Sequence, residues 1–164
     1  MHIKDKIDPG KSIMYAYIAI SIGDILAGVL SQVLKSRKKA LLIYYAITIV
    51  FIGLYFTVLE NGTANQMYLI CAGIGLGTGF WAIFVTMAAE QFGTNLRATA
   101  TTTVPNMVRG MLAVFIIPLF RFLQNYFDYL KSGWILAIIV MTISTLAILL
   151  IDETFNKNLD FIEN

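Results

Sequence analysis

The chain has 164 residues, of which 58% are hydrophobic and only 13% are charged, and its mean hydropathy is +0.74. A soluble domain has about 45–50% apolar and about 25% charged residues, so this composition excludes a single water-soluble core and indicates an integral membrane protein. The net charge of +2 is too small to suggest nucleic-acid binding, and the single cysteine excludes an intrachain disulfide.

Five apolar runs are each close to the ~20 residues that cross about 30 Å of hydrocarbon. They cover residues 12–34, 40–59, 67–90, 100–120 and 132–151. In lipid the backbone must satisfy its own hydrogen bonds, so we expect each run to be a transmembrane helix and the fold to be all-α. Residues 1–11 would then be an extracytoplasmic loop-like segment, residues 12–151 a five-helix transmembrane region, and residues 152–164 a cytosolic tail.

The basic residues predict the orientation. The densest cluster follows the first run and consists of Lys35, Arg37, Lys38 and Lys39. Because basic loops face the cytosol, this cluster places the tail in the cytosol and the N-terminus outside, in a multi-pass protein of the plasma (inner) membrane. The odd number of helices, and an outside N-terminus without a signal sequence, lead us to expect that the chain is part of something larger.

Asp24 lies about twelve residues into the first run, which is near the bilayer midplane at about 1.5 Å per residue. Arg109 lies at a similar depth in the fourth run. A charge at this depth costs about 2.5–3.5 kcal/mol on insertion scales, so each should face a cavity or a partner. Three interpretations stay open: a buried Asp24–Arg109 pair, packing against helices outside this chain, and a substrate or proton site.

The third run contains the sequence GIGLGTGFWA, whose four glycines are Gly73, Gly75, Gly77 and Gly79. This run has no preceding strand, so it fails the test for a dinucleotide-binding loop. Gly73 and Gly77 are four residues apart, and so are Gly75 and Gly79. This is the small-xxx-small spacing that lets membrane helices approach closely. Packing is therefore the favoured role, with flexibility at Gly75 and Gly79 as the alternative. The Phe80 and Trp81 rings that follow are candidates to line a pocket.

Glu90 ends the third run and Arg97 begins the fourth. A helix C-terminus favours a base and a helix N-terminus favours an acid, each by about 0.3–1 kcal/mol. Both residues therefore have the unfavourable charge for their helix end. We therefore expect the two to interact with each other or with the Lys35–Lys39 cluster. The alternative is a pair of solvated loop charges.

Pro105 lies four residues before Arg109 and cannot donate a hydrogen bond to the carbonyl of Thr101. This predicts a weakened turn and a kink, with nearby threonine hydroxyls available to the freed backbone groups.

The residues for common chemistry are absent from the sequence. It has one histidine and one cysteine, and it shows no carboxylate pair, no Ser/His/Asp set and no Cys/His cluster. We therefore expect a protein that is not an enzyme and that uses no metal or cofactor.

Three stretches resemble the C-terminal half of a major facilitator superfamily transporter. GDILAGVLSQVLKSRKKALL (residues 23–42) resembles the basic loop motif of that superfamily. AAEQFGTNLRATA (residues 88–100) resembles the Glu, aromatic, Arg signature of its sugar and organic-ion porter branches, with Glu90, Phe92 and Arg97 in matching places. DETFNKNLDFIE (residues 152–163) is similar to the segment that follows the last helix there. The five helices would correspond to helices eight to twelve of a twelve-helix fold.

The resemblance implies roles for these charges. A cytosolic charge network that favours the outward-facing state would consist of Arg37, Lys38, Glu90 and Arg97. The helices that carry Asp24 and Arg109 would flank the central cavity, and the helix that carries Trp81 would line it. Arg109 would then hold a substrate carboxylate or a neighbouring aspartate, and Asp24 is the candidate proton carrier.

These observations predict part of a secondary transporter that moves a small organic solute by alternating access. An organic anion is favoured, with a sugar second. The expected partners are membrane lipid, the solute and the missing N-terminal half, in the same parent chain or in a second chain, and nucleic acid is not expected. The alternative is a truncated, non-transporting membrane protein that only packs with a partner membrane protein.

Overall fold

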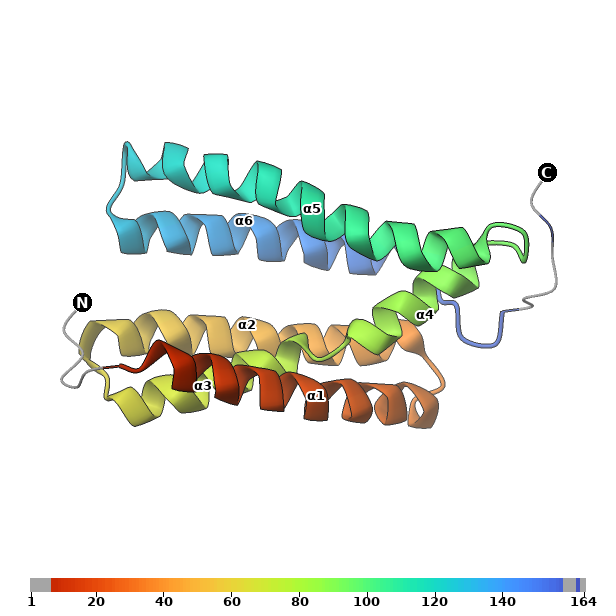
Figure 1. Cartoon of the computed structure of the whole chain (residues 1–164), viewed down its shortest axis with the longest axis horizontal. Helices are drawn as coiled ribbons and strands as arrows, with labels where there is room; N and C mark the ends of the chain where they lie inside the picture. The colour runs from red at the N-terminus through yellow and green to blue at the C-terminus, as the bar shows by residue number, and fades with distance from the viewer. Residues whose placement is uncertain (1–6, 158–161, 163–164) are drawn as a thin grey trace.

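The computed structural model describes residues 7–157 and residue 162, and this part of the chain is all-helical (Figure 1). Its helices are α1 (Pro9–Val33), α2 (Arg37–Asn61), α3 (Ala64–Thr78), α4 (Trp81–Gln91), α5 (Arg97–Gln124) and α6 (Tyr129–Leu150). They form five stretches that are long and apolar enough to cross a membrane, of which α3 and α4 together make one. The all-α prediction and its five apolar spans are confirmed, and they indicate a multi-pass membrane protein.

The two predicted terminal segments lie partly outside the described residues. Of the predicted 1–11 segment, residues 1–6 lie outside the described residues, and α1 already begins at Pro9. Of the predicted tail, residues 158–161 and 163–164 lie outside the described residues. The part of the tail that is described leaves α6 and turns back against the ends of α2 and α4.

The prediction of one continuous helix over residues 67–90 is wrong. α3 ends at Thr78, and α4 begins at Trp81. Gly79 has φ −74° and ψ 51°, outside the helical region, and its N–H closes a tight turn onto the carbonyl of Leu76 at 3.1 Å. The break is held by close packing, because a Cβ atom on Gly79 would lie 2.7 Å from the Cα atom of Gly23 in α1.

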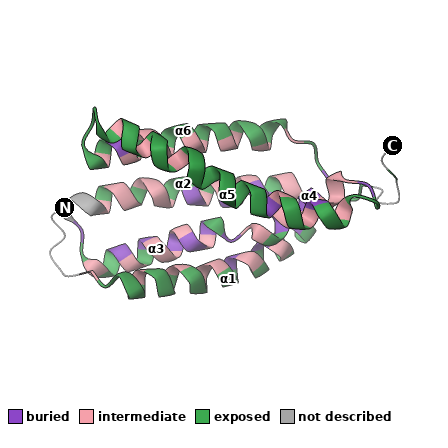
Figure 2. Cartoon of the chain, turned by 45° about the horizontal axis from the view of Figure 1, so that its top comes forward, coloured by how far each residue is buried: buried purple, intermediate pink, exposed green. Residues whose placement is uncertain are grey.

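Helix α3 lies between α1 and α2 and packs against both of them (Figure 2). The Gly73/Gly77 pair faces α2, and the Gly75/Gly79 pair faces α1. The residues that added Cβ atoms would strike are, in the order of the four glycines, Phe51, Ala16, Thr48 and Gly23. The predicted close packing is confirmed, since only hydrogen fits at these positions.

The α5–α6 hairpin forms a second layer above α1, α2 and α3 (Figure 1). It contacts the first layer through α2–α6 and α4–α5 packing, with α4 crossing between the layers. The core lies where α1, α2 and α4 meet, and its buried residues are Ala27, Ala40, Leu41, Tyr44, Ile83 and Met87. Exposed residues cover much of α1, α5 and α6 (Figure 2), and many of them are large and apolar, as a surface in contact with lipid requires.

Helix α5 continues without a break through Pro105 and Pro118, so the predicted kink does not interrupt it. The hydroxyls of Thr101 and Thr102 donate to backbone carbonyls of residues 97–99 at 3.0–3.1 Å. They therefore reinforce the first turn of α5, before Pro105.

Replacing Gly75 by alanine should destabilise the protein, because the new Cβ would collide with the carbonyl oxygen of Ala16. Overpacking of this kind costs about 1–3 kcal/mol, which exceeds the ~0.5–1 kcal/mol that alanine gains over glycine inside a helix. The measurement is the midpoint of unfolding in mixed micelles, followed by circular dichroism. Gly28→Ala is the control, since a Cβ at Gly28 meets open space. Equal stability of the two variants would contradict the close α1–α3 contact.

Candidate functional site

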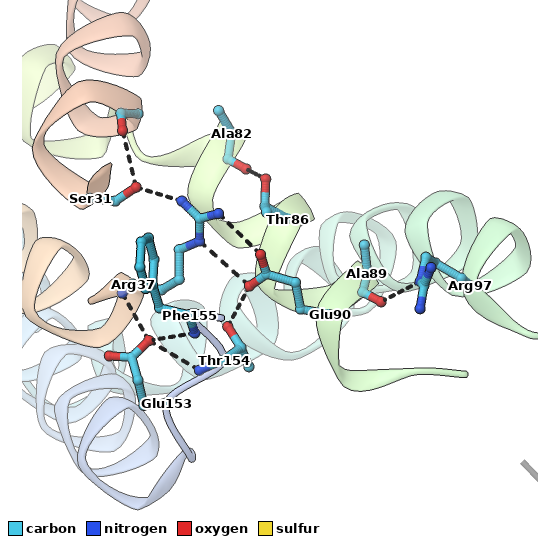
Figure 3. A network of polar contacts seen from close by, with 11 residues as sticks. Ser31, Arg37, Ala82, Thr86, Ala89, Glu90, Arg97, Glu153, Thr154 and Phe155 are labelled. Atoms are coloured by element: carbon cyan, nitrogen blue, oxygen red, sulfur yellow. Dashed lines mark hydrogen bonds and ion pairs between the residues drawn. The ribbon is translucent and has the colours of Figure 1, made fainter. Parts of the chain in front are cut away.

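Charged side chains gather at one end of the bundle, which comprises the α1–α2 turn, the α4–α5 turn and the segment after α6; we call it the charged end (Figure 3). Its centre is an ion pair between Arg37 at the start of α2 and Glu90 near the end of α4, with 3.0 Å between Nη2 and Oε1. The two side chains are only 13% and 12% exposed, so the pair is largely withdrawn from solvent. Glu90 therefore pairs with the Lys35–Lys39 cluster, through Arg37, and not with Arg97.

The Arg37–Glu90 pair also binds its surroundings. Arg37 donates through Nη1 to the hydroxyl of Ser31 at 2.7 Å, and that hydroxyl donates to a carbonyl in the last turns of α1. Thr154 donates to Oε2 of Glu90 at 2.6 Å, and the guanidinium carbon of Arg37 lies 5.3 Å from the ring centroid of Phe155. The pair therefore connects α1, α2, α4 and the segment after α6 (Figure 3).

Glu153 caps the start of α2. Its carboxylate accepts the backbone N–H groups of Arg37 at 2.9 Å and Lys38 at 3.2 Å, together with the hydroxyl of Ser36. Burial alone would raise the pKa of Glu153, but the hydrogen bonds from Ser36 and from the N–H groups of Phe155, Arg37 and Lys38 outweigh burial and lower this pKa to about 2. A carboxylate at a helix N-terminus has the favourable sign for the helix dipole.

Lys38 does not join the Arg37–Glu90 pair. Its Nζ atom donates to the carbonyl oxygens of Leu149 at 2.7 Å and Ile151 at 3.0 Å, at the end of α6. Glu153 and Lys38 thus join α2 and α6 from both directions, since an acid from beyond α6 caps α2 and a base from α2 caps α6.

Arg97, at the start of α5, likewise donates hydrogen bonds to the end of another helix, α4. Its Nε atom donates to the carbonyl of Ala89 at 3.1 Å, and Nη2 donates to that of Phe92 at 3.4 Å, both at the end of α4. The predicted network of Arg37, Lys38, Glu90 and Arg97 therefore includes the Arg37–Glu90 ion pair and the helix-end contacts of Lys38 and Arg97. All four residues lie at the charged end.

A second group of predicted residues lies within the spans. Asp24 is partly buried and accepts the backbone N–H of Ala82, in the first turn of α4, at 3.1 Å. The guanidinium of Arg109 lies over the Trp81 ring, 4.2 Å from its centroid. Among the described side chains, the Arg109 guanidinium has no hydrogen bond or ion pair, so the direct Asp24–Arg109 pair does not form. Arg109 instead contacts Trp81, whose neighbour Ala82 donates its N–H to Asp24.

An apolar cavity of about 610 Å³ lies between α2, α4, α5 and α6. Phe80 and Trp81 line it, as predicted, together with other rings from α2 and α4 such as Tyr45 and Phe84. Asp24 and Arg109 do not line it, but both contact the first turn of α4, where Trp81 forms part of the wall.

Three further residues of the charged end were not predicted from the sequence: Glu153, Thr154 and Ser36. Ser36 carried a signal, since a serine just before an apolar run is typical of a helix N-cap. Nothing in the spacing predicted its partner Glu153, which is 117 residues away. In the described ranges, no three His, Cys, Asp or Glu side chains come together as metal ligands would.

Comparison of the chain with protein-family models, with curated proteins and with solved structures finds no match. The relation to the major facilitator superfamily therefore stays a prediction that rests on the three sequence stretches.

Glu153 should make stability depend on pH. Its pKa in the folded protein is about 2 against an ordinary 4.5, so its contribution is present above about pH 5 and is lost as the pH falls toward about 2. The unfolding midpoint of Glu153→Gln should lie below that of the natural protein at neutral pH, and the difference should shrink as acid is added.

The control is Asp152→Asn, because the Asp152 side chain has no hydrogen-bond partner within the part of the chain that the structure describes. The same pH-dependent difference in both variants would mean that the general loss of a negative charge, and not the cap on α2, is responsible.

Proposed function

We propose that this chain is part of a secondary transporter that moves a small organic solute across the membrane by alternating access. An organic anion is the favoured solute class, and a sugar is second. The observation that carries the proposal is Arg109, a cation within a membrane span that is stacked on Trp81 beside an apolar cavity of about 610 Å³.

The guanidinium of Arg109 is suited to a carboxylate. Arginine presents N–H donors in a fixed fork that matches a carboxylate in two parallel hydrogen bonds. Its contact with the Trp81 ring is worth about 0.5–2 kcal/mol, which is less than the ~2.5–3.5 kcal/mol that an arginine costs within a membrane span. An anionic ligand would supply the remaining stabilisation.

The cavity is suited to the apolar body of such a solute. Pockets for small ligands have volumes of about 300–1,000 Å³, are mostly apolar and have few polar groups. The rings of Phe80, Trp81 and Phe84 in its wall favour a flat, aromatic carboxylate over a sugar, which needs many hydrogen-bond partners.

The broken span agrees with this location. Discontinuous helices near the midplane form the binding sites of many secondary transporters. Here the break at residues 79–80 immediately precedes Trp81, whose ring touches Arg109.

The charged end is suited to a gate. The Arg37–Glu90 pair and the Glu153 cap connect helices of both layers, so breaking these contacts would let the layers move apart at this end. We assign the charged end to the cytosolic side, where its closure favours the outward-facing state. The solute pathway would be completed by an N-terminal half in the same parent chain or in a second chain, in contact with membrane lipid.

The second candidate is a membrane protein that does not transport and only packs with a partner membrane protein. It is favoured by the large apolar side chains exposed along α5, including Val114, Phe115 and Phe122. The two candidates differ in whether a solute crosses the membrane.

The test is uptake of radiolabelled benzoate into membrane vesicles from source cells with and without the gene, so that natural partners are present. Arg109→Gln should reduce the gene-dependent uptake at least about tenfold, because a lost charge-assisted contact of 1.5–3 kcal/mol corresponds to about that factor. Arg121→Gln is the control, since Arg121 is exposed at the far end of α5.

Equal uptake with Arg109→Gln and Arg121→Gln would contradict the anion site. Gene-dependent uptake of glucose in place of benzoate would favour the sugar. No gene-dependent uptake of either solute would favour the non-transporting candidate.

A further inference from the structure

Helix α4 begins within a membrane span and is not capped by its own neighbours. Its N-cap residue is Phe80, whose side chain makes no capping hydrogen bond. The helices α1, α2 and α3 each begin with a short polar side chain that accepts a first-turn N–H, and these residues are Asp8, Ser36 and Thr63. The first N–H groups of α4 therefore need an acceptor from elsewhere, because in an apolar setting an unpaired N–H costs several kcal/mol.

Asp24 of α1 provides that acceptor. Its Oδ1 atom lies 3.1 Å from the N–H of Ala82, the second residue of α4, which is the group that an N-cap side chain ordinarily serves. The position of Asp24 is fixed by the neighbouring Gly23, which packs directly on Gly79 of the break. The carboxylate thus acts as an N-cap that comes from a different helix.

The charge of this cap can change. As a carboxylate, Asp24 is an acceptor with the favourable sign at the positive end of α4. As a carboxylic acid it loses the charge, and its carbonyl oxygen still accepts an N–H but in a hydrogen bond roughly half as strong. Protonation therefore weakens the bond that positions the first turn of α4, to which Trp81 belongs.

The other titratable groups around Asp24 do not change their protonation state in the acidic range in which a carboxyl does. From α2, Tyr44 donates its hydroxyl to the carbonyl of Gly23 at 2.9 Å and stays neutral in the acidic range. From α5, Arg109 reaches this region through Trp81 and stays protonated. On α4 itself, Glu90 lies at the opposite end, paired with Arg37. The titratable residues of α3, Tyr68 and Cys71, lie in its first half, away from the break.

We propose that Asp24 is a proton-sensitive brace: when ionised it holds the first turn of α4 and keeps Trp81 against Arg109, and when protonated it holds both less firmly. Asp24 is in this sense a positioning residue. The role of this brace in transport, where a proton would alter the solute site, rests on the proposed function. The brace itself can be tested without measuring transport.

The test is the fluorescence of Trp81 in the purified full chain in detergent, from about pH 8 to about pH 3, a range that extends below the ordinary carboxyl titration. The chain has two tryptophans, so the Trp134→Phe variant reports Trp81 alone. We expect a single sigmoidal step in its emission, because the indole is then held less firmly against the guanidinium. Adding Asp24→Asn, which keeps an oxygen acceptor but cannot ionise, should abolish the step, while Asp152→Asn, at an acid without a hydrogen-bond partner in the described part of the chain, should leave it in place.

Circular dichroism confirms that each variant is folded. If Asp24→Asn does not fold, Asp24→Glu replaces it, and its longer carboxylate should move the midpoint of the step. No step in the parent, a step that persists in Asp24→Asn, or a midpoint that Asp24→Glu leaves unchanged would overturn the proposal. A step without gene-dependent uptake would refute the transporter and keep the brace, whereas uptake without a step would do the reverse.

Discussion

The backbone groups left unpaired at helix ends are the constraint on which this structure depends. In a span-rich chain, little water is available to them, so side chains must serve them. Local caps exist at the starts of α1, α2 and α3, but charges from distant helices serve other ends. Asp24 reaches the start of α4, Lys38 reaches the end of α6, and Arg97 reaches the end of α4. Each contact satisfies a backbone group and also fixes one element against another.

This constraint explains charges that look misplaced in the sequence. Lys38 and Arg97 each stand in the first turn of their own helix, where a base is unfavourable, but each donates to carbonyls at the end of another helix, where a base is favourable. Glu90 ends α4 with the wrong sign and finds Arg37. The sequence therefore revealed that these charges need partners. It did not identify them, because sequence separations such as the 53 residues between Arg37 and Glu90 depend on how the helices pack.

Hydropathy predicted the five spans to within a few residues, since the bilayer sets both the length and the composition of a crossing helix. The break at Gly79 was not predicted, because the apolar run continues through it and the cause is contact with Gly23 of another helix. The site, too, was predicted only in part. The Phe80 and Trp81 rings were recognised as pocket residues, whereas the stacking of Arg109 on Trp81 depends on the crossing of α4 and α5.

Helix α4 connects the two groups of polar contacts. Its eleven residues begin beside Asp24 and Arg109 and end beside Arg37 and Arg97. At about 1.5 Å per residue it is a rod of about 16 Å, too short to bend appreciably. A shift at its first turn must therefore reach Glu90, where the Arg37–Glu90 pair resists it. Because both groups of contacts hold one short helix, the proposed loosening at Asp24 would also weaken the charged end, and the reverse would follow by linkage.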